Sequence, residues 1–192
     1  MRFVQSADRV EALPDSRAEL AVVGRSNVGK SSLVNALGGS KALAKTSKTP
    51  GRTQLLNLFE VLEPAARGGT LVDCPGYGYA SAPGHLRQSW QKMAERYLLE
   101  REPLRCILVL VDGEVGPTKL DLQLLEWLRH HDRPFAVVAT KHDKVKSSVR
   151  DKRKRELAER CEVAPGDVVW VSSHKGVGID RLRALVVNLL AA

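Results

Sequence analysis

The chain has 192 residues, which is enough for one well-packed domain and too few for two ordinary ones. Hydrophobic residues make up 43% of the chain, a share that argues against a disordered or fibrous protein. The formal net charge of +8 favours polyanionic partners, and nucleic acid is the obvious candidate.

Membrane insertion and export leave no signal in the sequence. No apolar run approaches the ~18 residues that a membrane span needs. Residues 1–10 lack the apolar stretch of a signal peptide. Cys74, Cys106 and Cys161 are scattered without a metal-binding pattern, which favours reduced thiols. We therefore expect a cytoplasmic protein that does not associate with a membrane.

Short apolar runs alternate with helical patterns along most of the chain. Six runs are typical of buried strands, at residues 20–23, 55–62, 69–73, 106–111, 135–138 and 168–171. The second and third are joined by a loop too short for a crossover helix, so that pair should be antiparallel. Helical periodicity marks residues 90–98, 120–128 and 179–189. This order predicts a doubly wound α/β fold, with a six-stranded, mostly parallel sheet, one antiparallel strand and helices on both faces.

The first chemical motif follows the first predicted strand. Gly24-Arg-Ser-Asn-Val-Gly-Lys-Ser31 fits the phosphate-binding pattern G-x-x-x-x-G-K-[ST], between a strand and a helix. Gly24 and Gly29 let the backbone wrap around phosphates, and the helix N-terminus adds its positive dipole end. Lys30 should reach the β- and γ-phosphates, and the Ser31 hydroxyl should bind Mg²⁺. The alternative, a glycine-rich turn without a ligand, is disfavoured because the motif directly follows a strand.

Asp73-Cys-Pro-Gly76 ends the third predicted strand, at the edge of the sheet where ligands bind. Asp73 should hold Mg²⁺ through a water molecule, and the Gly76 N–H should meet the γ-phosphate. That second contact needs a triphosphate, so hydrolysis would release the segment that follows. By itself the pattern Asp-x-x-Gly is common by chance, and its place in the chain is what gives it meaning.

Thr140-Lys-His-Asp143 follows the fifth predicted strand. Asp143 can accept two hydrogen bonds from guanine that adenine cannot offer, and sites of this kind discriminate by ~10⁴–10⁵. Lys141 would lay its stem along the base. The alternative is a solvated Lys/Asp turn. After the last strand, Val171-Ser172-Ser173 can present backbone N–H groups to the guanine oxygen.

A second Mg²⁺ ligand should come from Lys48-Thr-Pro-Gly-Arg-Thr53. This segment lies between the phosphate-binding motif at residues 24–31, called the P-loop from here on, and Asp73. Both Thr53 and Thr49 offer a hydroxyl there. Spacing alone does not decide between them.

Together these motifs resemble the EngB (YihA/YsxC) family of bacterial GTPases, in the TrmE-Era-EngA-EngB-septin class. The resemblance rests on Gly24-Arg-Ser-Asn-Val-Gly-Lys-Ser-Ser32, Lys48-Thr-Pro-Gly-Arg-Thr-Gln54, Asp73-Cys-Pro-Gly-Tyr-Gly-Tyr-Ala80 and Thr140-Lys-His-Asp143. Residues 3–7 and 116–118 fit as well, so it covers essentially the whole chain. It implies Thr53 as the loop ligand, a role in assembling the large ribosomal subunit, and a requirement for normal cell division and septation. The family usually has a small residue in place of His142, and Arg-His in place of Glu114-Val115.

The motifs and the resemblance imply a G domain over residues 18–192, preceded by an N-terminal extension over residues 1–17. Mg²⁺ would be held by Ser31 and Thr53 directly and by Asp73 through water. The expected catalytic residues are Asn27, Lys30, Thr53 and Gly76. The expected GTP-binding residues are Gly24, Arg25, Ser26, Asn27, Val28, Gly29, Lys30, Ser31, Gly51, Arg52, Thr53, Gln54, Leu55, Asp73, Cys74, Pro75, Gly76, Thr140, Lys141, His142, Asp143, Val171, Ser172 and Ser173.

The residue after Gly76 bears on the reaction rate. Ras-like GTPases carry a glutamine there that orients the attacking water. Tyr77 is too bulky and apolar for that role, so unassisted hydrolysis should be slow, on the order of 10⁻³ s⁻¹ or less. The resemblance implies that Asn27 helps to hold a K⁺ ion beside the phosphates. The alternative is that Asn27 only hydrogen-bonds the loop backbone.

Two other functions fit parts of the sequence. A P-loop kinase for a small molecule would need arginines on a lid and usually lacks the Thr-Lys-x-Asp motif. A nucleic-acid-binding module could bind GTP only to stabilise its fold. The basic residues in 141–155 support an anionic partner. These residues could equally form a solvated helix face. Besides GTP and GDP, we expect the large ribosomal subunit or its rRNA as a partner of a monomeric protein.

Overall fold

The computed structural model describes residues 1–40, 42–44, 55–77 and 84–192, with the backbone alone for residues 84–91. The described strands form one sheet in the order β1-β3-β4-β2-β5-β6-β7. The strands are β1 (Arg2–Ala7), β2 (Ala18–Gly24), β3 (Leu56–Glu60), β4 (Gly69–Asp73), β5 (Leu104–Asp112), β6 (Phe135–Thr140) and β7 (Val169–Trp170). All six expected strands are present, and the doubly wound α/β fold is confirmed.

The sheet has seven strands where six were expected, because β1 joins it. β1 pairs antiparallel with β3 from Arg2↔Glu60 to Ala7↔Leu56. It lies at the sheet edge and most of its residues are exposed, so it shows no apolar run. β3 is also antiparallel to β4, as predicted, and is therefore the one reversed strand. The boundary between residues 1–17 and 18–192 stays a prediction, although β1 lies before it and pairs with β3.

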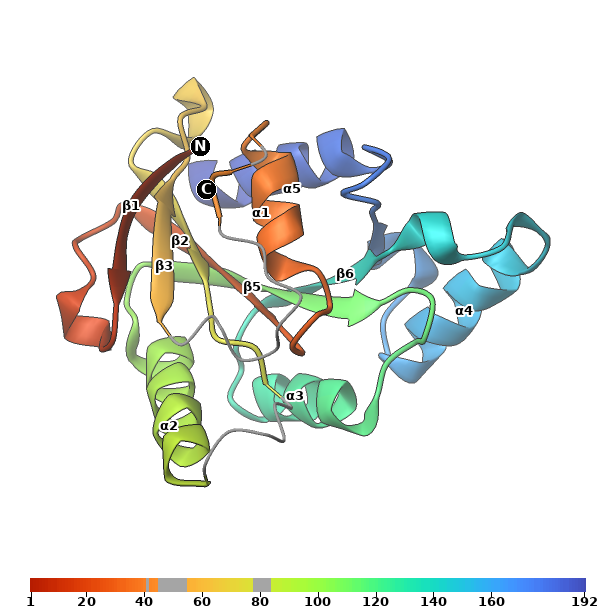
Figure 1. The fold of residues 1–192 in the computed structure, drawn as a ribbon, viewed down its shortest axis with the longest axis horizontal. Coiled ribbons are helices and arrows are strands. Elements are labelled where there is room, and N and C mark those ends of the chain that lie inside the picture. The colour runs from red at the N-terminus through yellow and green to blue at the C-terminus, as the bar shows by residue number, and fades with distance from the viewer. Residues whose placement is uncertain (41, 45–54, 78–83) are drawn as a thin grey trace.

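The helices cover both faces of the sheet (Figure 1). On one face lie α1 (Lys30–Leu37) and α5 (Ile179–Ala191), and on the other α2 (Gly84–Glu100) and α3 (Lys119–His130). α4 (Arg150–Arg160) buries Leu157 and Ala158 in the core that α2 and α3 share.

Alternating residues of β2 serve the two cores, as a strand with period two requires. Leu20 and Val22 pack with α1 and α5, whereas Ala21 and Val23 belong to the core on the α2 and α3 side. These strand residues are 4% exposed or less, which explains the continuous apolar runs in the sequence.

Four parallel strands place the predicted motifs at one edge of the sheet. β2 pairs parallel with β4 and β5, and β5 pairs parallel with β6. Their carboxyl ends therefore meet, with β2 at the point where the strand order reverses. All three cysteines are buried and free in the structure. No helix in the described part of the chain is both long and apolar enough to span a membrane.

Candidate nucleotide-binding site

Glycines shape the turn from β2 into α1. Gly29 precedes α1 with a φ of +112°, in the left-handed region that side chains rarely adopt. A Cβ on Gly24 would lie 2.8 Å from Val28 Cγ1 and 3.0 Å from Leu110 O, so only glycine fits there. The backbone therefore turns sharply enough to start the helix at Lys30, in the arrangement that the motif predicts.

Lys30 lies beneath this turn and is 8% exposed. Its Nζ donates to Gly24 O at 3.0 Å and to Arg25 O at 3.2 Å. Burial lowers the pKa of Lys30, and the Asp73 carboxylate opposes that shift. The carbonyls of the loop thus hold the ammonium group at the place where phosphates are expected.

Ser31 and Asp73 come together at the end of β4. Ser31 Oγ donates to Asp73 Oδ2 at 3.3 Å, and Asp73 is 1% exposed. Asp73 Oδ1 is buried without a hydrogen-bond partner among the described residues. Burial raises the pKa of Asp73 to about 6, against the charge of Lys30 and the Ser31 hydrogen bond. A hydroxyl and an orphaned carboxylate oxygen suit a hard cation such as Mg²⁺.

The segment after β4 runs against the P-loop. The Cys74 N–H donates to Val22 O at 3.0 Å, and the Ser26 N–H donates to Tyr77 O at 3.0 Å. A Cβ on Gly76 would lie 2.8 Å from Lys30 Nζ, so Gly76 lies directly beside the ammonium group. Pro75, between Cys74 and Gly76 in the chain, is partly exposed. The two segments predicted to bind phosphate are therefore neighbours.

The expected guanine-binding motif follows β6. Thr140 Oγ1 donates to Val28 O at 2.7 Å and so joins the end of β6 to the P-loop. Lys141 has a φ of +56°, and its Nζ lies 2.6 Å from Asp112 Oδ2. Asp112 was not among the expected site residues. Its one signal in the sequence is its place at the carboxyl end of a predicted strand.

Asp143 and Ser172 connect the ends of β6 and β7. The Ser172 hydroxyl, fully buried, donates to Asp143 Oδ1 at 2.6 Å, while Asp143 itself is exposed. This hydrogen bond is the largest of the influences that lower the pKa of Asp143, so the group remains an ionised acceptor. The carboxylate has a defined orientation and is open to a ligand.

Of the three N–H donors expected after the last strand, two are used inside the protein. The Val171 N–H donates to Ala139 O and the Ser172 N–H to Val177 O. The first continues the pairing with β6, and the second closes a bridge between Ser172 and Val177. Among the described residues the Ser173 N–H is the one of the three without a backbone partner, and the Ser172 hydroxyl contacts Asp143.

The remaining expected residues fall into two groups. Arg25 is half-buried, Asn27 is exposed with a φ of +64°, and His142 donates its N–H to Val171 O at 3.0 Å. Leu55 is 39% exposed and immediately precedes β3. Gly51, Arg52, Thr53 and Gln54 lie outside the described residues, so the proposed second Mg²⁺ ligand does too.

The fold and this edge of the sheet define a P-loop GTP-binding protein. A family model described as the 50S ribosome-binding GTPase matches residues 19–141. A probable GTP-binding protein EngB of Vibrio parahaemolyticus is 45% identical over 95% of this chain and 83% of its own. The corresponding protein of Roseobacter denitrificans is 44% identical, over 97% of this chain and 87% of its own. The chain belongs to the EngB family of GTP-binding proteins.

Solved structures agree with that assignment. The crystal structure of a probable GTP-binding protein EngB matches with a TM-score of 0.72 at 25% identity, covering 90% of this chain and 98% of that one. Era of Aquifex aeolicus matches with a TM-score of 0.71 at 24% identity, covering 91% of this chain and 57% of its own. The Era likeness concerns the fold alone.

Proposed function

We propose that this protein is a GTP-hydrolysing molecular switch that acts in assembly of the large ribosomal subunit in the cytoplasm, and that normal division and septation need it. The observation that carries the proposal is the meeting of Lys30, Asp73 and Asp143 at one edge of the sheet. Lys30 and Asp73 suit a phosphate chain with its cation, and Asp143 suits guanine. Membership of the EngB family supports the ribosomal part.

Co-sedimentation with large ribosomal subunits tests the switch. We expect association with the non-hydrolysable GTP analogue and release with GDP, because Gly76 can meet a γ-phosphate in the first case alone. Turnover of GTP with and without subunits should accompany the measurement. Binding that ignores the nucleotide would favour a nucleic-acid-binding module with structural GTP, and phosphate transfer to a small molecule would favour a kinase.

In this mechanism Mg²⁺ would be held by Ser31 directly, by Asp73 through water and by Thr53. When bound, the ion neutralises charge on the β- and γ-phosphates. Lys30 binds the same phosphates from beneath the loop, and the Gly76 N–H, next to the Lys30 ammonium group, donates to the γ-phosphate. Asp143 and Lys141 orient the base.

Slow intrinsic turnover follows from the side chain at position 77. Burial, and then the neighbouring Asp121 carboxylate, raise the pKa of Tyr77 far above its ordinary value. Its hydroxyl donates to Asp121 Oδ1 at 2.8 Å. A phenol that stays protonated and engaged in this way cannot serve as a base for the attacking water.

Asn27→Ala should remove a stimulation of GTP hydrolysis by K⁺. In the unaltered protein we expect K⁺ to raise kcat over Na⁺ by about tenfold or more, because a cation beside the phosphates stabilises the charge that develops there. The exposed Asn27 side chain leaves its amide oxygen available to such an ion. The measurement is kcat at saturating GTP in the two salts at equal ionic strength.

Asn188→Ala, an exposed position on α5, is the matched control and should retain the salt difference. If the unaltered protein has equal rates in K⁺ and Na⁺, Asn27 does not bind K⁺ and only hydrogen-bonds the backbone of the turn.

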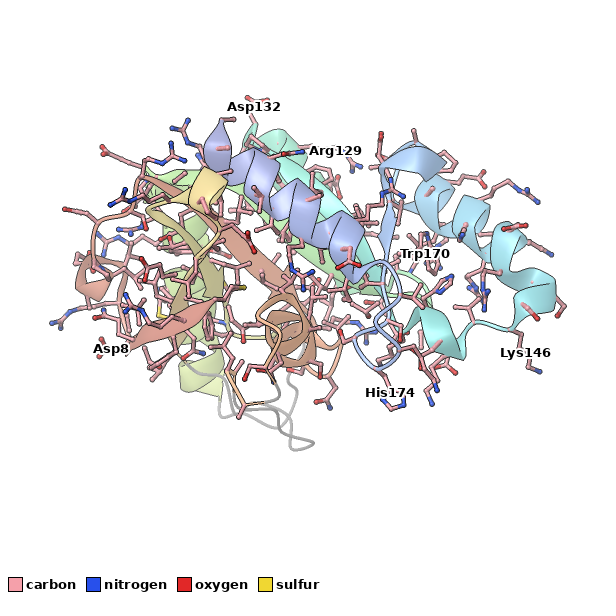
Figure 2. The ribbon with its side chains drawn as sticks, turned by 90° about the horizontal axis from the view of Figure 1, so that it is seen from above. Asp8, Arg129, Asp132, Lys146, Trp170 and His174 are labelled. Atoms are coloured by element: carbon pink, nitrogen blue, oxygen red, sulfur yellow. The ribbon has the colours of Figure 1, made fainter. Side chains whose placement is uncertain are left out.

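The ribosome-facing surface is proposed to include α4 and the segment before it. Lys144, Lys146 and Arg155 are exposed and Lys154 is half-buried. Among the described residues none of these four has an ion-pair partner, in contrast to Lys152, whose Nζ lies 3.8 Å from Glu156. Figure 2 shows Lys146 and Asp8 at opposite ends of the molecule, with α4 beside Lys146. Unpaired cations gathered in this way favour an RNA backbone over a merely solvated face.

Reversing the charge of Lys146, Lys154 and Arg155 to glutamate should weaken binding to the large subunit and make it less sensitive to salt. Each lost phosphate contact lowers the slope of log K against log salt by ~0.7–0.9. GTP affinity should not change, because none of the three lies in the expected nucleotide site. Binding is measured by sedimentation over a range of salt concentrations.

The same change of net charge can be placed elsewhere, on the exposed Arg67, Lys92 and Arg105. That control should lower affinity less and keep the steeper slope. If both variants behave alike, overall charge rather than this surface drives the association.

A further inference from the structure

Asp121 on α3 is a fully buried carboxylate with partners in three separate segments. Its Oδ1 accepts the Tyr77 hydroxyl at 2.8 Å. Its Oδ2 accepts the N–H and the hydroxyl of Thr118, each at 2.7 Å. The same oxygen lies 3.3 Å from Nε of Arg25. One carboxylate therefore joins the P-loop, the segment after Gly76 and the start of α3.

Helix capping explains only part of this arrangement. Thr118 and Asp121 form a capping box at the N-terminus of α3, and its two hydrogen bonds need no residue from elsewhere. A cap is satisfied equally well at the protein surface. Complete burial of the charge is costly, and it is compensated here by Arg25 and Tyr77, which come from the nucleotide-binding edge.

The backbone reinforces the same connection. Arg25 and Tyr77 form a parallel β-bridge, and the Ser26 N–H donates to Tyr77 O at 3.0 Å. Gly76 immediately precedes the residue that is anchored in this way. A Cβ on Gly76 would lie 2.8 Å from Lys30 Nζ and 3.0 Å from Ser26 N. The position of Gly76 beside Lys30 thus depends on where Tyr77 is held.

The Tyr77 hydroxyl is suited to a lasting contact with a carboxylate. Burial and the charge of Asp121 raise its pKa, so it stays protonated and donates across the accessible pH range. Nε of Arg25 is itself buried and makes no hydrogen bond within the described part of the chain. Its interaction with Asp121 is therefore one of charge, which balances the buried carboxylate.

We propose that Asp121 is a positioning residue for γ-phosphate recognition: it anchors Tyr77 to Arg25 and so keeps Gly76 beside Lys30. The inference rests on the proposed contact between Gly76 and the γ-phosphate. GDP has no γ-phosphate and does not use that contact. Asp121 therefore sets the preference for the triphosphate over the diphosphate, without touching either nucleotide.

Two variants test this role. Asp121→Asn keeps the side-chain volume and removes the charge, and Tyr77→Phe removes only the hydroxyl that Asp121 accepts. In each we expect the Kd for a non-hydrolysable GTP analogue to rise by about tenfold, the effect of one hydrogen bond to a charged group. The Kd for GDP should stay within about twofold of that of the unaltered protein. The effects of the two changes should not add in the double variant, because Asp121→Asn removes the charge behind the hydrogen bond that Tyr77→Phe deletes.

Thr118→Val is the matched control. It removes a hydrogen bond to the same carboxylate and weakens the helix cap, but it leaves the Tyr77 contact in place. We expect it to lower the melting temperature and to leave the ratio of the two nucleotide affinities unchanged. If Asp121→Asn does not fold, Tyr77→Phe decides the question by itself.

Three results would overturn the proposal. Equal weakening of GDP and the analogue would give Asp121 a structural role alone. Unchanged affinity for the analogue in Tyr77→Phe would show that the anchor is not needed, and tighter binding of it would show that the anchor hinders the triphosphate. An unaltered protein that bound neither nucleotide would instead contradict the proposed function itself.

Discussion

Lys30→Ala should abolish tight GTP binding, with a loss of affinity of about 100-fold or more. The ammonium group lies beneath the P-loop, where Gly24 O and Arg25 O hold it. Charge-assisted hydrogen bonds from this group to the β- and γ-phosphates would each be worth up to about 3 kcal/mol, and alanine has no replacement for them. Titration of labelled GDP and of a GTP analogue gives both affinities directly.

The loss should not arise from misfolding. Burial lowers the pKa of Lys30, which means that the buried charge itself disfavours the folded state. Its removal offsets the loss of the two hydrogen bonds to the loop, so we expect a small change in melting temperature. Lys92→Ala, at an exposed lysine of α2, should leave both nucleotide affinities unchanged. Affinity close to that of the unaltered protein in Lys30→Ala would contradict the P-loop assignment.

Asp143→Asn should exchange the preference for guanine for one for xanthine. Guanine offers two donors, and xanthine has a carbonyl where guanine has its amine. We expect affinity for GTP to fall and affinity for xanthosine triphosphate to rise, so that their ratio changes by about 100-fold or more. Competition of each nucleotide against labelled GDP measures the ratio.

The contact between Asp143 and Ser172 gives a geometric reason for this exchange. The buried Ser172 hydroxyl donates to Oδ1 at 2.6 Å. In the asparagine variant the same hydroxyl should keep the amide oxygen in that place, and the amide nitrogen would then face the base. Asp151→Asn makes the same chemical change on an exposed part of α4 and should leave the preference for GTP intact. If Asp143→Asn also retains that preference, Asp143 does not contact the base.

Local patterns in the sequence were sufficient to predict most of the fold. A strand buried on both faces is apolar over most of its length, as β2 is over residues 20–23 and β5 over residues 106–111, so six strands were recognisable from residue type alone. The glycine turn before the helix was predicted for a similar reason, because a tight turn around phosphates allows few residue types, and the structure adds a positive φ at Gly29 and a helix start at Lys30. β1 escaped prediction because an exposed edge strand needs no apolar run.

Contacts between distant segments were decided by the tertiary structure alone. Lys141 pairs with Asp112, and Tyr77 with Asp121, across 29 and 44 positions of sequence. The Ser172 hydroxyl contacts Asp143, whereas its N–H closes a bridge with Val177. The sequence by itself determined which residues end the strands, since residue type and spacing are local properties. Which of them touch depends on strand order and on burial, and these arise only when the sheet is assembled.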